Sequence, residues 1–223
     1  MILLVGVAHV IDLREALKKV LQDFAPTAVA VELDPDRFQA LVDREKDRAA
    51  GRPPVRKSGA PMLLRVWSSV QDRLAADLGD VPGSEMLIAY STAQEMSVPL
   101  FLVDDPIRQV APRLMNSLSV KERVGLMLSS VIALVTPSQV VQKGLAQYTQ
   151  DRESYVQAMR EQFPSVARVL IDERNLHMAQ RLEALSVQFS KVAAVVGDAH
   201  ISGLEGLLKG RTEVSIRHLV GSG

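Results

Sequence analysis

Two histidines in this sequence stand in the same short pattern, Gly-x-Ala-His, which occurs once near each end of the chain. The first copy is Gly6-Val7-Ala8-His9 and the second is Gly197-Asp198-Ala199-His200, and each directly follows a continuous apolar run. Such a run is typical of a strand that is covered on both faces of an open sheet. Ligands bind at the carboxyl ends of the strands in these sheets. We therefore predict that His9 and His200 lie at one sheet edge and belong to one functional site.

For either histidine alone, a turn residue bonded to a neighbouring carbonyl is the simpler interpretation. The repeated setting favours a functional site instead, because only four histidines are present and two of them share it. In both copies, glycine three residues earlier also lets the backbone approach a ligand or another strand closely.

Polar side chains follow each of the first four predicted strands at the point where the strand ends. These side chains are His9, Glu32, Asp34, Asp104, Asp105, Asp198 and His200. All of them are able to bind a metal ion or to exchange a proton. Because parallel strands end at the same edge of a sheet, we expect them to lie close together.

Glu32 is the most informative of these acids, because it lies within the apolar run 30–33. An unpaired carboxylate is costly to bury, so a positive group must lie beside it. A metal ion would serve, and so would Arg174, which stands in the otherwise helical segment 172–175. A buried Glu–Arg pair with no chemistry is the structural alternative.

Two histidines and a carboxylate form a ligand set that proteins use for zinc and other divalent ions, with positions left open for water and substrate. A metal bound in this way lets water lose a proton near neutral pH. The sequence has no cysteine, which excludes thiolate ligands, thiolate catalysis and disulfides. The motif His-Glu-x-x-His is absent, as are the glycine-rich phosphate loops and the Gly-x-Ser-x-Gly elbow. Nucleotide-binding enzymes and serine hydrolases are therefore disfavoured.

The composition is that of a globular protein, with 26 basic and 26 acidic residues among 223 and 47% hydrophobic residues. A net charge of zero gives no indication of a nucleic-acid partner. The sequence opens directly into an apolar run without a basic segment or cleavage site, so we expect no secretory signal and a cytoplasmic location. The longest apolar region, 124–141, is interrupted by polar residues, so we expect no membrane-spanning segment.

The order of apolar runs predicts an α/β (α+β) fold, with a central, mainly parallel or mixed sheet of about five strands. The predicted strands are 2–5, 28–33, 100–103, 192–196 and 214–219. The predicted helices before the third strand are 13–24 with Asp12 as N-cap, one that starts at Asp34-Pro35, 63–78, and 84–96 with Ser84 as N-cap. A large helical insertion over about 110–185, with breaks at Pro112, Pro137 and Pro164, is expected to cover the sheet. We expect a single domain, 1–223, with a mobile basic loop at 49–61.

Beside that loop, the segment 62–67 forms an apolar cluster that contains the sole tryptophan, Trp67. Aromatic residues are scarce in this chain, so we interpret the cluster as core. A homodimer interface is the alternative, if the cluster is exposed in the monomer.

Taken in order, four segments resemble the motifs of the TraB/PrgY family, and the resemblance spans almost the whole chain. The segments are Gly6-Val7-Ala8-His9-Val10, Val31-Glu32-Leu33-Asp34 with Arg37, Asp172-Glu173-Arg174-Asn175 with Met178-Ala179, and Val195-Val196-Gly197-Asp198-Ala199-His200 with Gly203. That family belongs with the GumN and Tiki proteins in a group that resembles the erythromycin esterase and ChaN folds. Glu85 and Arg113 also fit the family pattern.

The resemblance implies a metal-dependent protease activity, which is described for Tiki proteins, with His9, Glu32 and His200 as the catalytic and metal-binding residues. Where the family commonly has Asp-Arg after the third strand, this chain has Asp104-Asp105, so one expected positive charge is missing. PrgY-like members often continue into membrane helices, and this chain ends soon after the fifth strand, so membrane anchoring is not carried over.

These observations favour a metal-dependent hydrolase that acts on a peptide or small-molecule substrate. His9, Glu32 and His200 would hold a divalent ion such as Mn, Co or Zn, and Glu32 completes the shell or accepts a proton from water. The residues expected to bind substrate or stabilise negative charge are Asp104, Arg113, Arg174 and Asn175. The alternative is a non-catalytic protein that binds a peptide or other small ligand, in a regulatory role, at the same place. Haem capture, by analogy with ChaN, is a third and weaker hypothesis.

Overall fold

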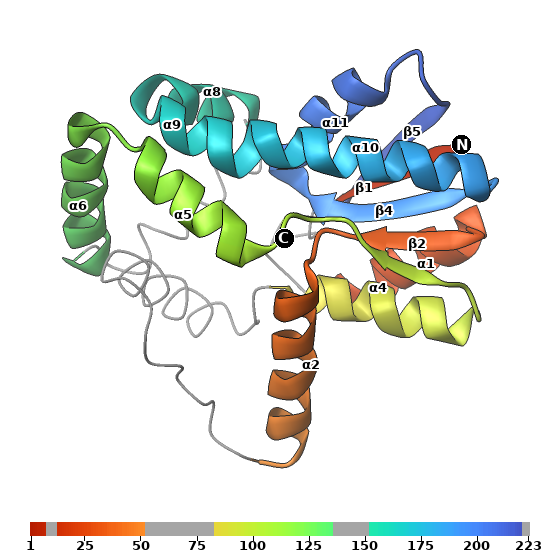
Figure 1. Cartoon of the computed structure of the whole chain (residues 1–223). Helices are drawn as coiled ribbons and strands as arrows, with labels where there is room; N and C mark the ends of the chain where they lie inside the picture. The colour runs from red at the N-terminus through yellow and green to blue at the C-terminus, as the bar shows by residue number, and fades with distance from the viewer. Residues whose placement is uncertain (8–12, 52–82, 136–151, 220–223) are drawn as a thin grey trace.

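Five parallel strands form one sheet in the order β3-β2-β4-β1-β5 (Figure 1). The computed structural model describes residues 1–7, 13–51, 83–135 and 152–219. The strands are β1 (Ile2–Val7), β2 (Ala28–Val31), β3 (Leu100–Leu102), β4 (Val192–Gly197) and β5 (Val214–Leu219). The prediction of an α/β fold with about five strands is confirmed, and every pairing is parallel rather than mixed.

The two strands that carry the Gly-x-Ala-His motifs are direct neighbours in the sheet. Ile2 of β1 pairs with Val192 of β4, and the register continues to Val7 opposite Gly197. Chain segments almost two hundred residues apart therefore end side by side at the carboxyl edge. The sequence predicted a shared edge for the two motifs, but not that their strands are direct neighbours. His9 itself lies outside the described residues.

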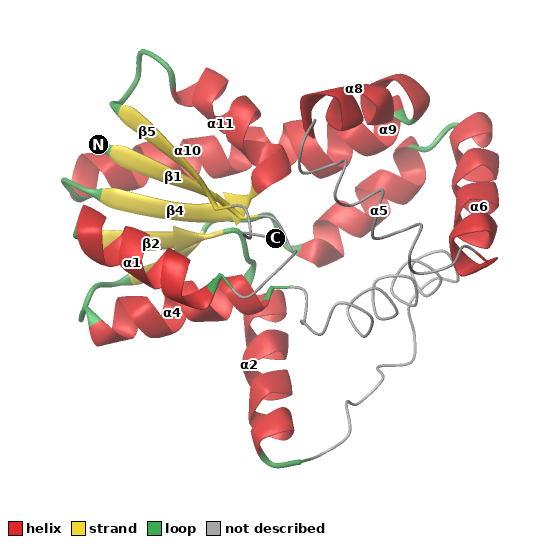
Figure 2. Cartoon of the chain, turned by 180° about the vertical axis from the view of Figure 1, so that it is seen from behind, coloured by secondary structure: helices red, strands yellow, loops and turns green. Residues whose placement is uncertain are grey.

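Helices cover both faces of the sheet (Figure 2). One face packs against α1 (Arg14–Phe24) and α4 (Ser84–Glu95), and the other against α10 (Glu173–Gln188) and α11 (Ile201–Leu208). Alternate β1 residues enter the two cores, with Leu3 and Val5 on the α1 side and Ile2 and Leu4 on the α10 side. This burial on both faces explains why the sequences of the central strands are continuous apolar runs.

The remaining described helices lie at or beyond the carboxyl ends of the strands (Figures 1 and 2). They are α2 (Pro35–Ala49), α5 (Ile107–Ser117), α6 (Val120–Val135), α8 (Arg152–Gln162) and α9 (Pro164–Ala167). A π-helix, Arg168–Asp172, joins α9 to α10. Of the predicted helical insertion, α10 therefore covers the sheet, whereas its other described helices extend past the edge where a ligand would bind. None of the helices in the described residues is long and apolar enough to cross a membrane.

Several local predictions are tested at helix ends. The Asp34 carboxylate caps α2, because it accepts hydrogen bonds from the backbone N–H groups of Asp36 at 2.9 Å and Arg37 at 3.2 Å. The prediction that Ser84 is an N-cap is wrong. Gly83 takes the cap position, with φ of 93°, and Ser84 is the first helical residue. Pro112 lies inside α5, which continues through it instead of breaking.

Other predictions fall wholly or mainly on residues that are not described. These are the Asp12 cap, the basic loop 49–61, the cluster 62–67, the helix 63–78 and the break at Pro137.

Candidate functional site

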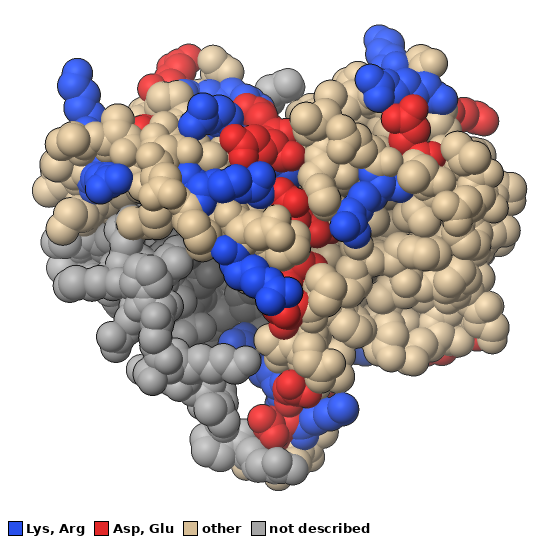
Figure 3. Space-filling model, viewed as in Figure 1, with Lys and Arg blue, Asp and Glu red and all other residues tan. Residues whose placement is uncertain are grey.

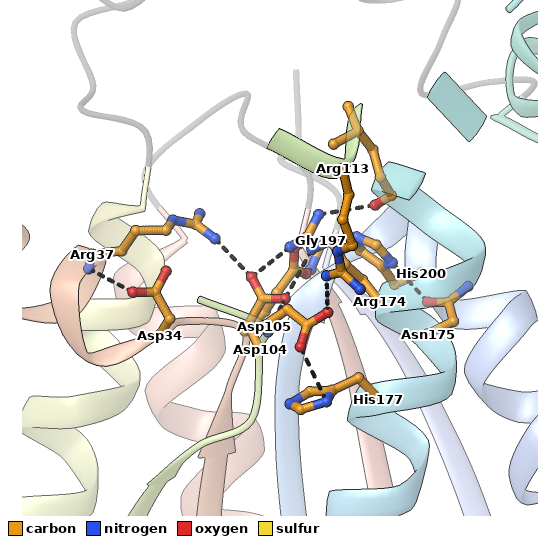
Figure 4. Close-up of polar contacts among 12 residues, drawn as sticks. Asp34, Arg37, Asp104, Asp105, Arg113, Arg174, Asn175, His177, Gly197 and His200 are labelled. Atoms are coloured by element: carbon orange, nitrogen blue, oxygen red, sulfur yellow. Dashed lines mark hydrogen bonds and ion pairs between the residues drawn. The ribbon is translucent and has the colours of Figure 1, made fainter. Parts of the chain in front are cut away.

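The carboxyl edge of the sheet brings five predicted site residues together. Figure 4 labels Asp104, Arg174, Asn175 and His200 among them. Glu32 directly follows β2, Asp104 follows β3, and His200 ends the 3-10 turn that follows β4. Arg174 and Asn175 reach the same place from the first turn of α10. Residues that are far apart in the sequence are thus positioned by a rigid sheet and one helix.

The Glu32 carboxylate has three polar partners, and the residue is only 8% exposed. Oε2 accepts a hydrogen bond from the Gly197 backbone N–H at 2.7 Å. Oε1 accepts from Nη2 of Arg174 and lies 3.2 Å from Nε2 of His200. Gly197 packs closely here, because a Cβ at that position would be 3.2 Å from Oε2. The buried Glu–Arg pair considered from the sequence is therefore present.

These partners decide the charge of Glu32. Burial alone raises the pKa of its carboxyl, but the neighbouring His200 and Arg174 side chains and the Gly197 N–H outweigh that effect. They hold the pKa of Glu32 well below its ordinary value. Glu32 is consequently an ionised carboxylate at neutral pH.

Asn175 fixes the orientation of the His200 ring, which is 5% exposed. Its Oδ1 lies 2.7 Å from Nδ1 of His200, and an amide oxygen only accepts hydrogen bonds, so Nδ1 donates its N–H there. Nε2 is then the nitrogen directed at Glu32. Gly203 of α11 permits this arrangement, since a Cβ at its position would come within 2.2 Å of the Asn175 amide nitrogen.

Arg174 is held by a bidentate ion pair with Asp104, through Nε to Oδ1 at 2.8 Å and Nη2 to Oδ2 at 2.7 Å. Its Nη1 also donates to the carbonyl of Leu170 in the π-helix at 3.0 Å. Burial lowers the pKa of Arg174, but Glu32 and Asp104 reverse the effect and raise it above its ordinary value. The guanidinium is a permanent positive charge beside Glu32.

A second set of arginines surrounds this centre and is more exposed. Arg37 donates from Nη1 to Oδ2 of Asp104 at 2.8 Å, and its side chain is 40% exposed. Arg113 of α5 pairs with Oδ2 of Asp105, and its side chain is 42% exposed. Asp105 also lies 3.1 Å from Nδ1 of His177. Asp105 stands where the family commonly has an arginine, and Arg113 supplies a positive charge next to it.

Acidic groups outnumber basic ones in this cluster. Its charged members are the carboxylates of Glu32, Asp34, Asp104, Asp105 and Glu173 and the guanidinium groups of Arg37, Arg113, Arg168 and Arg174. Five carboxylates therefore stand against four guanidinium groups. Figure 3 shows acidic side chains in a band down the middle of this face, with basic side chains on both sides.

The described side chains supply two adjacent donor atoms for a metal ion, Oε1 of Glu32 and Nε2 of His200. Within residues 1–7, 13–51, 83–135 and 152–219, no group of three His, Asp or Glu side chains is arranged to hold one. For a metal ion to bind here, a third ligand would have to come from another part of the chain or from solvent. The sequence predicts His9 for this role.

His218 received no role in the sequence analysis, although it lies at the same edge. It stands one residue before the end of β5 and is 2.7 Å from Asp198, through Nδ1 and Oδ1. Glu32, Asp104 and His200 follow the ends of strands, whereas His218 lies inside the last strand, so its position in the sequence gives no such signal.

The parallel sheet, covered on both faces and carrying an ionic cluster at its carboxyl edge, defines an α/β protein with a candidate ligand site at the strand ends. This chain belongs to the TraB/PrgY/gumN family, which it matches over residues 1–213. The resemblance predicted from the ordered motifs is confirmed.

A relative in Methanocaldococcus jannaschii, named "Uncharacterized protein MJ1365", is 30% identical over 212 residues. The alignment covers 93% of this chain and 53% of the relative, so the chain spans about half the length of that protein. The name of this relative gives no activity.

Proposed function

We propose that this protein is a metal-dependent hydrolase that cleaves peptides at the carboxyl edge of its sheet. The observation that carries the proposal is the 3.2 Å separation between Oε1 of Glu32 and Nε2 of His200. Both atoms accept hydrogen bonds when the carboxylate is ionised and Nδ1 holds the only proton of the imidazole. Two such atoms side by side in a buried site need a cation between them, either a proton or a metal ion.

The donor set suits a divalent metal. Two ligands that each bind one zinc ion at about 2.0–2.2 Å in a tetrahedral shell are about 3.3–3.6 Å apart, slightly more than the separation of Oε1 and Nε2. Asn175 supports the fit, because a ligating histidine normally donates its other N–H to a fixed acceptor. When bound, the ion would supply an activated water and a Lewis acid.

The chain's own residues would divide the remaining work by their exposure. The Asp104 side chain is buried, the Arg174 side chain is only 13% exposed, and the two are bonded to each other, so they keep Glu32 in place. Arg37 and Arg113 are about two-fifths exposed, so their guanidinium groups are the ones available to a substrate carbonyl or to developing negative charge. Arg113 is therefore a substrate-binding residue in this proposal, and Arg174 and Asn175 orient the metal ligands.

Metal titration tests the proposal directly. Metal-free protein would be titrated with Mn²⁺, Co²⁺ and Zn²⁺ by calorimetry, beside His9→Ala, Glu32→Gln and His200→Ala, and each loaded sample would be assayed on a mixed peptide library. We expect one ion per chain, a loss of affinity of at least about 100-fold in His200→Ala, and cleavage only with metal. Glu95→Gln is the matched control, because Glu95 lies in an exposed pair with Lys18. Wild-type protein that binds no metal and cleaves nothing would overturn the proposal.

The Arg174–Glu32 ion pair favours one competing function. Because Arg174 already compensates the Glu32 charge within the chain, the edge can be stable without metal and can bind a ligand without turning it over. This alternative predicts that peptide binding is unchanged by a chelator, whereas the hydrolase predicts that a chelator abolishes cleavage.

A further inference from the structure

Asp198 and His218 form a second acid–base pair at the edge, separate from Glu32 and His200. Oδ1 of Asp198 lies 2.7 Å from Nδ1 of His218. The Asp198 side chain is 2% exposed, whereas the His218 side chain is 42% exposed. One member is thus a buried, fixed carboxylate and the other is a histidine that solutes can reach.

The pair spans an intervening strand, and Gly6 makes this possible. Asp198 follows β4 and His218 lies on β5, with β1 between them in the sheet. In the β1–β5 register, Gly6 stands opposite His218. A Cβ on Gly6 would lie 2.5 Å from Oδ1 of Asp198, so a larger residue would displace the carboxylate. The glycine of the first Gly-x-Ala-His motif therefore makes room for the aspartate of the second.

The strand order also places His218 at the same edge of the sheet as the proposed centre. β4 and β5 are two strand spacings apart, which is about 10 Å, and the Asp198 and His218 side chains close this gap above β1. Asp198 is two residues before His200 in the same 3-10 turn. The proposed metal pair comes from the ends of β2 and β4, and the Asp198–His218 pair crosses β1, so both pairs lie along one edge.

A buried carboxylate at Nδ1 gives the imidazole two properties that proton transfer requires. It fixes the N–H on Nδ1, which makes Nε2 the nitrogen that exchanges protons, and it stabilises the imidazolium. The same arrangement orients histidine in many hydrolases.

We propose that His218, oriented by Asp198, is the general acid that protonates the leaving amine during peptide cleavage. This inference rests on the proposed hydrolase function. Hydrolysis forms a C–O bond to water and breaks the C–N bond, and the leaving nitrogen takes a proton from Nε2 of the His218 imidazolium. The neutral ring then recovers a proton from the water that was consumed, so His218 ends the cycle unchanged.

The test compares His218→Ala with Arg217→Gln, a control at the preceding, exposed residue of the same strand. For each variant we would measure kcat, KM and metal affinity, and then repeat the assay with added imidazole. We expect kcat of His218→Ala to fall about 10²- to 10⁴-fold with KM and metal affinity within twofold of wild type. Added imidazole should restore part of kcat, because the exposed position leaves room for it. Asp198→Asn should lower kcat in the same direction.

The outcomes separate this inference from the hydrolase proposal. Metal-dependent cleavage that is unaffected by His218→Ala, or that falls without recovery in imidazole, overturns the role of His218 and leaves the hydrolase intact. Wild-type protein without any cleavage overturns both. Should His218→Ala fail to fold by circular dichroism, His218→Gln retains the volume of the side chain without an exchangeable ring proton and is assayed in its place.

Discussion

Arg174 and Asp104 form a bidentate ion pair that holds the guanidinium against Glu32, with Nε–Oδ1 and Nη2–Oδ2 distances of 2.8 and 2.7 Å. Because Asp104 follows β3 and Arg174 begins α10, this pair ties the edge of the sheet to the helix that carries Asn175. The positions of Glu32 and His200 therefore depend on an ion pair in which neither partner is a proposed metal ligand.

Removal of Asp104 should destabilise the protein and disturb the site. Asp104→Ala leaves the largely buried Arg174 with only Glu32 as a charged partner, so we expect the free energy of unfolding to fall by about 3 kcal/mol. Urea denaturation measures the effect. Glu183→Gln is the control, because its pair with Arg211 is exposed and should contribute no more than about 0.5 kcal/mol. Equal effects in the two variants would contradict the importance of the Arg174–Asp104 pair.

Two glycines of α11 provide a matched test of the His200 support. Gly203→Ala would place a Cβ 2.2 Å from Nδ2 of Asn175 and push that side chain away from His200, whereas a Cβ at Gly206 meets nothing within 4 Å. We expect Gly203→Ala to lower metal affinity by about 10- to 100-fold, as the loss of an outer-shell partner does. Gly206→Ala should leave affinity unchanged and stabilise the helix by about 0.5–1 kcal/mol.

Calorimetry and thermal unfolding of the two variants decide the point. If Gly203→Ala binds metal as wild type does, Asn175 is not required to orient His200.

Gly6→Ala tests whether Asp198 needs the space that the missing side chain of Gly6 leaves. The new Cβ would lie 2.5 Å from Oδ1 of Asp198 and 2.8 Å from Cγ1 of Ile201, so we expect a loss of about 1–3 kcal/mol in stability from overpacking. We also expect Gly6→Ala to lower kcat as Asp198→Asn does. The assay is run under conditions in which Gly6→Ala is folded. A Gly6→Ala variant with wild-type kcat would show that the contact between Asp198 and His218 is dispensable.

The strand positions and the residues at their ends were predictable from local pattern. Continuous apolar runs predicted strands covered on both sides, and helices on both faces explain them. Arg174 was identified as a partner for Glu32 because a carboxylate within an apolar frame requires one, and the pair is present.

The relations across strands were not predictable, because they depend on strand order. Nothing local indicates that β1 lies between β4 and β5, so neither the space at Gly6 nor the contact between Asp198 and His218 could be read from the sequence. The π-helix before Arg174 is similarly invisible, since its residues have an ordinary helical pattern. Pro112 was expected to break a helix, but α5 continues through it with the loss of one backbone hydrogen bond.

Glu122 should give the helical region beyond the sheet a marked acid sensitivity. Burial raises the pKa of this carboxyl, but hydrogen bonds from Ser119 and Ser165 outweigh it and lower the pKa to about 2. Oε2 accepts from the N–H and Oγ of Ser119 at 2.8 and 2.7 Å, and Oε1 accepts from the Ser165 N–H at 2.7 Å, so Glu122 joins the start of α6 to the start of α9. A carboxyl with a lowered folded-state pKa stabilises the protein fully above its ordinary pKa of 4.5. That contribution should be lost as the pH falls from 4.5 to about 2.

Glu122→Gln measures this contribution. At pH 7 it should destabilise the protein by about 2 kcal/mol, because a neutral amide replaces the carboxylate that accepts the charge-assisted hydrogen bonds. The difference in unfolding free energy between wild type and variant should shrink between pH 4.5 and about 2, as Glu122 takes up a proton. Urea denaturation at several pH values gives the comparison, with Glu161→Gln as the exposed control. A difference that stays constant down to pH 2 would mean that the stabilisation by Glu122 does not depend on its charge.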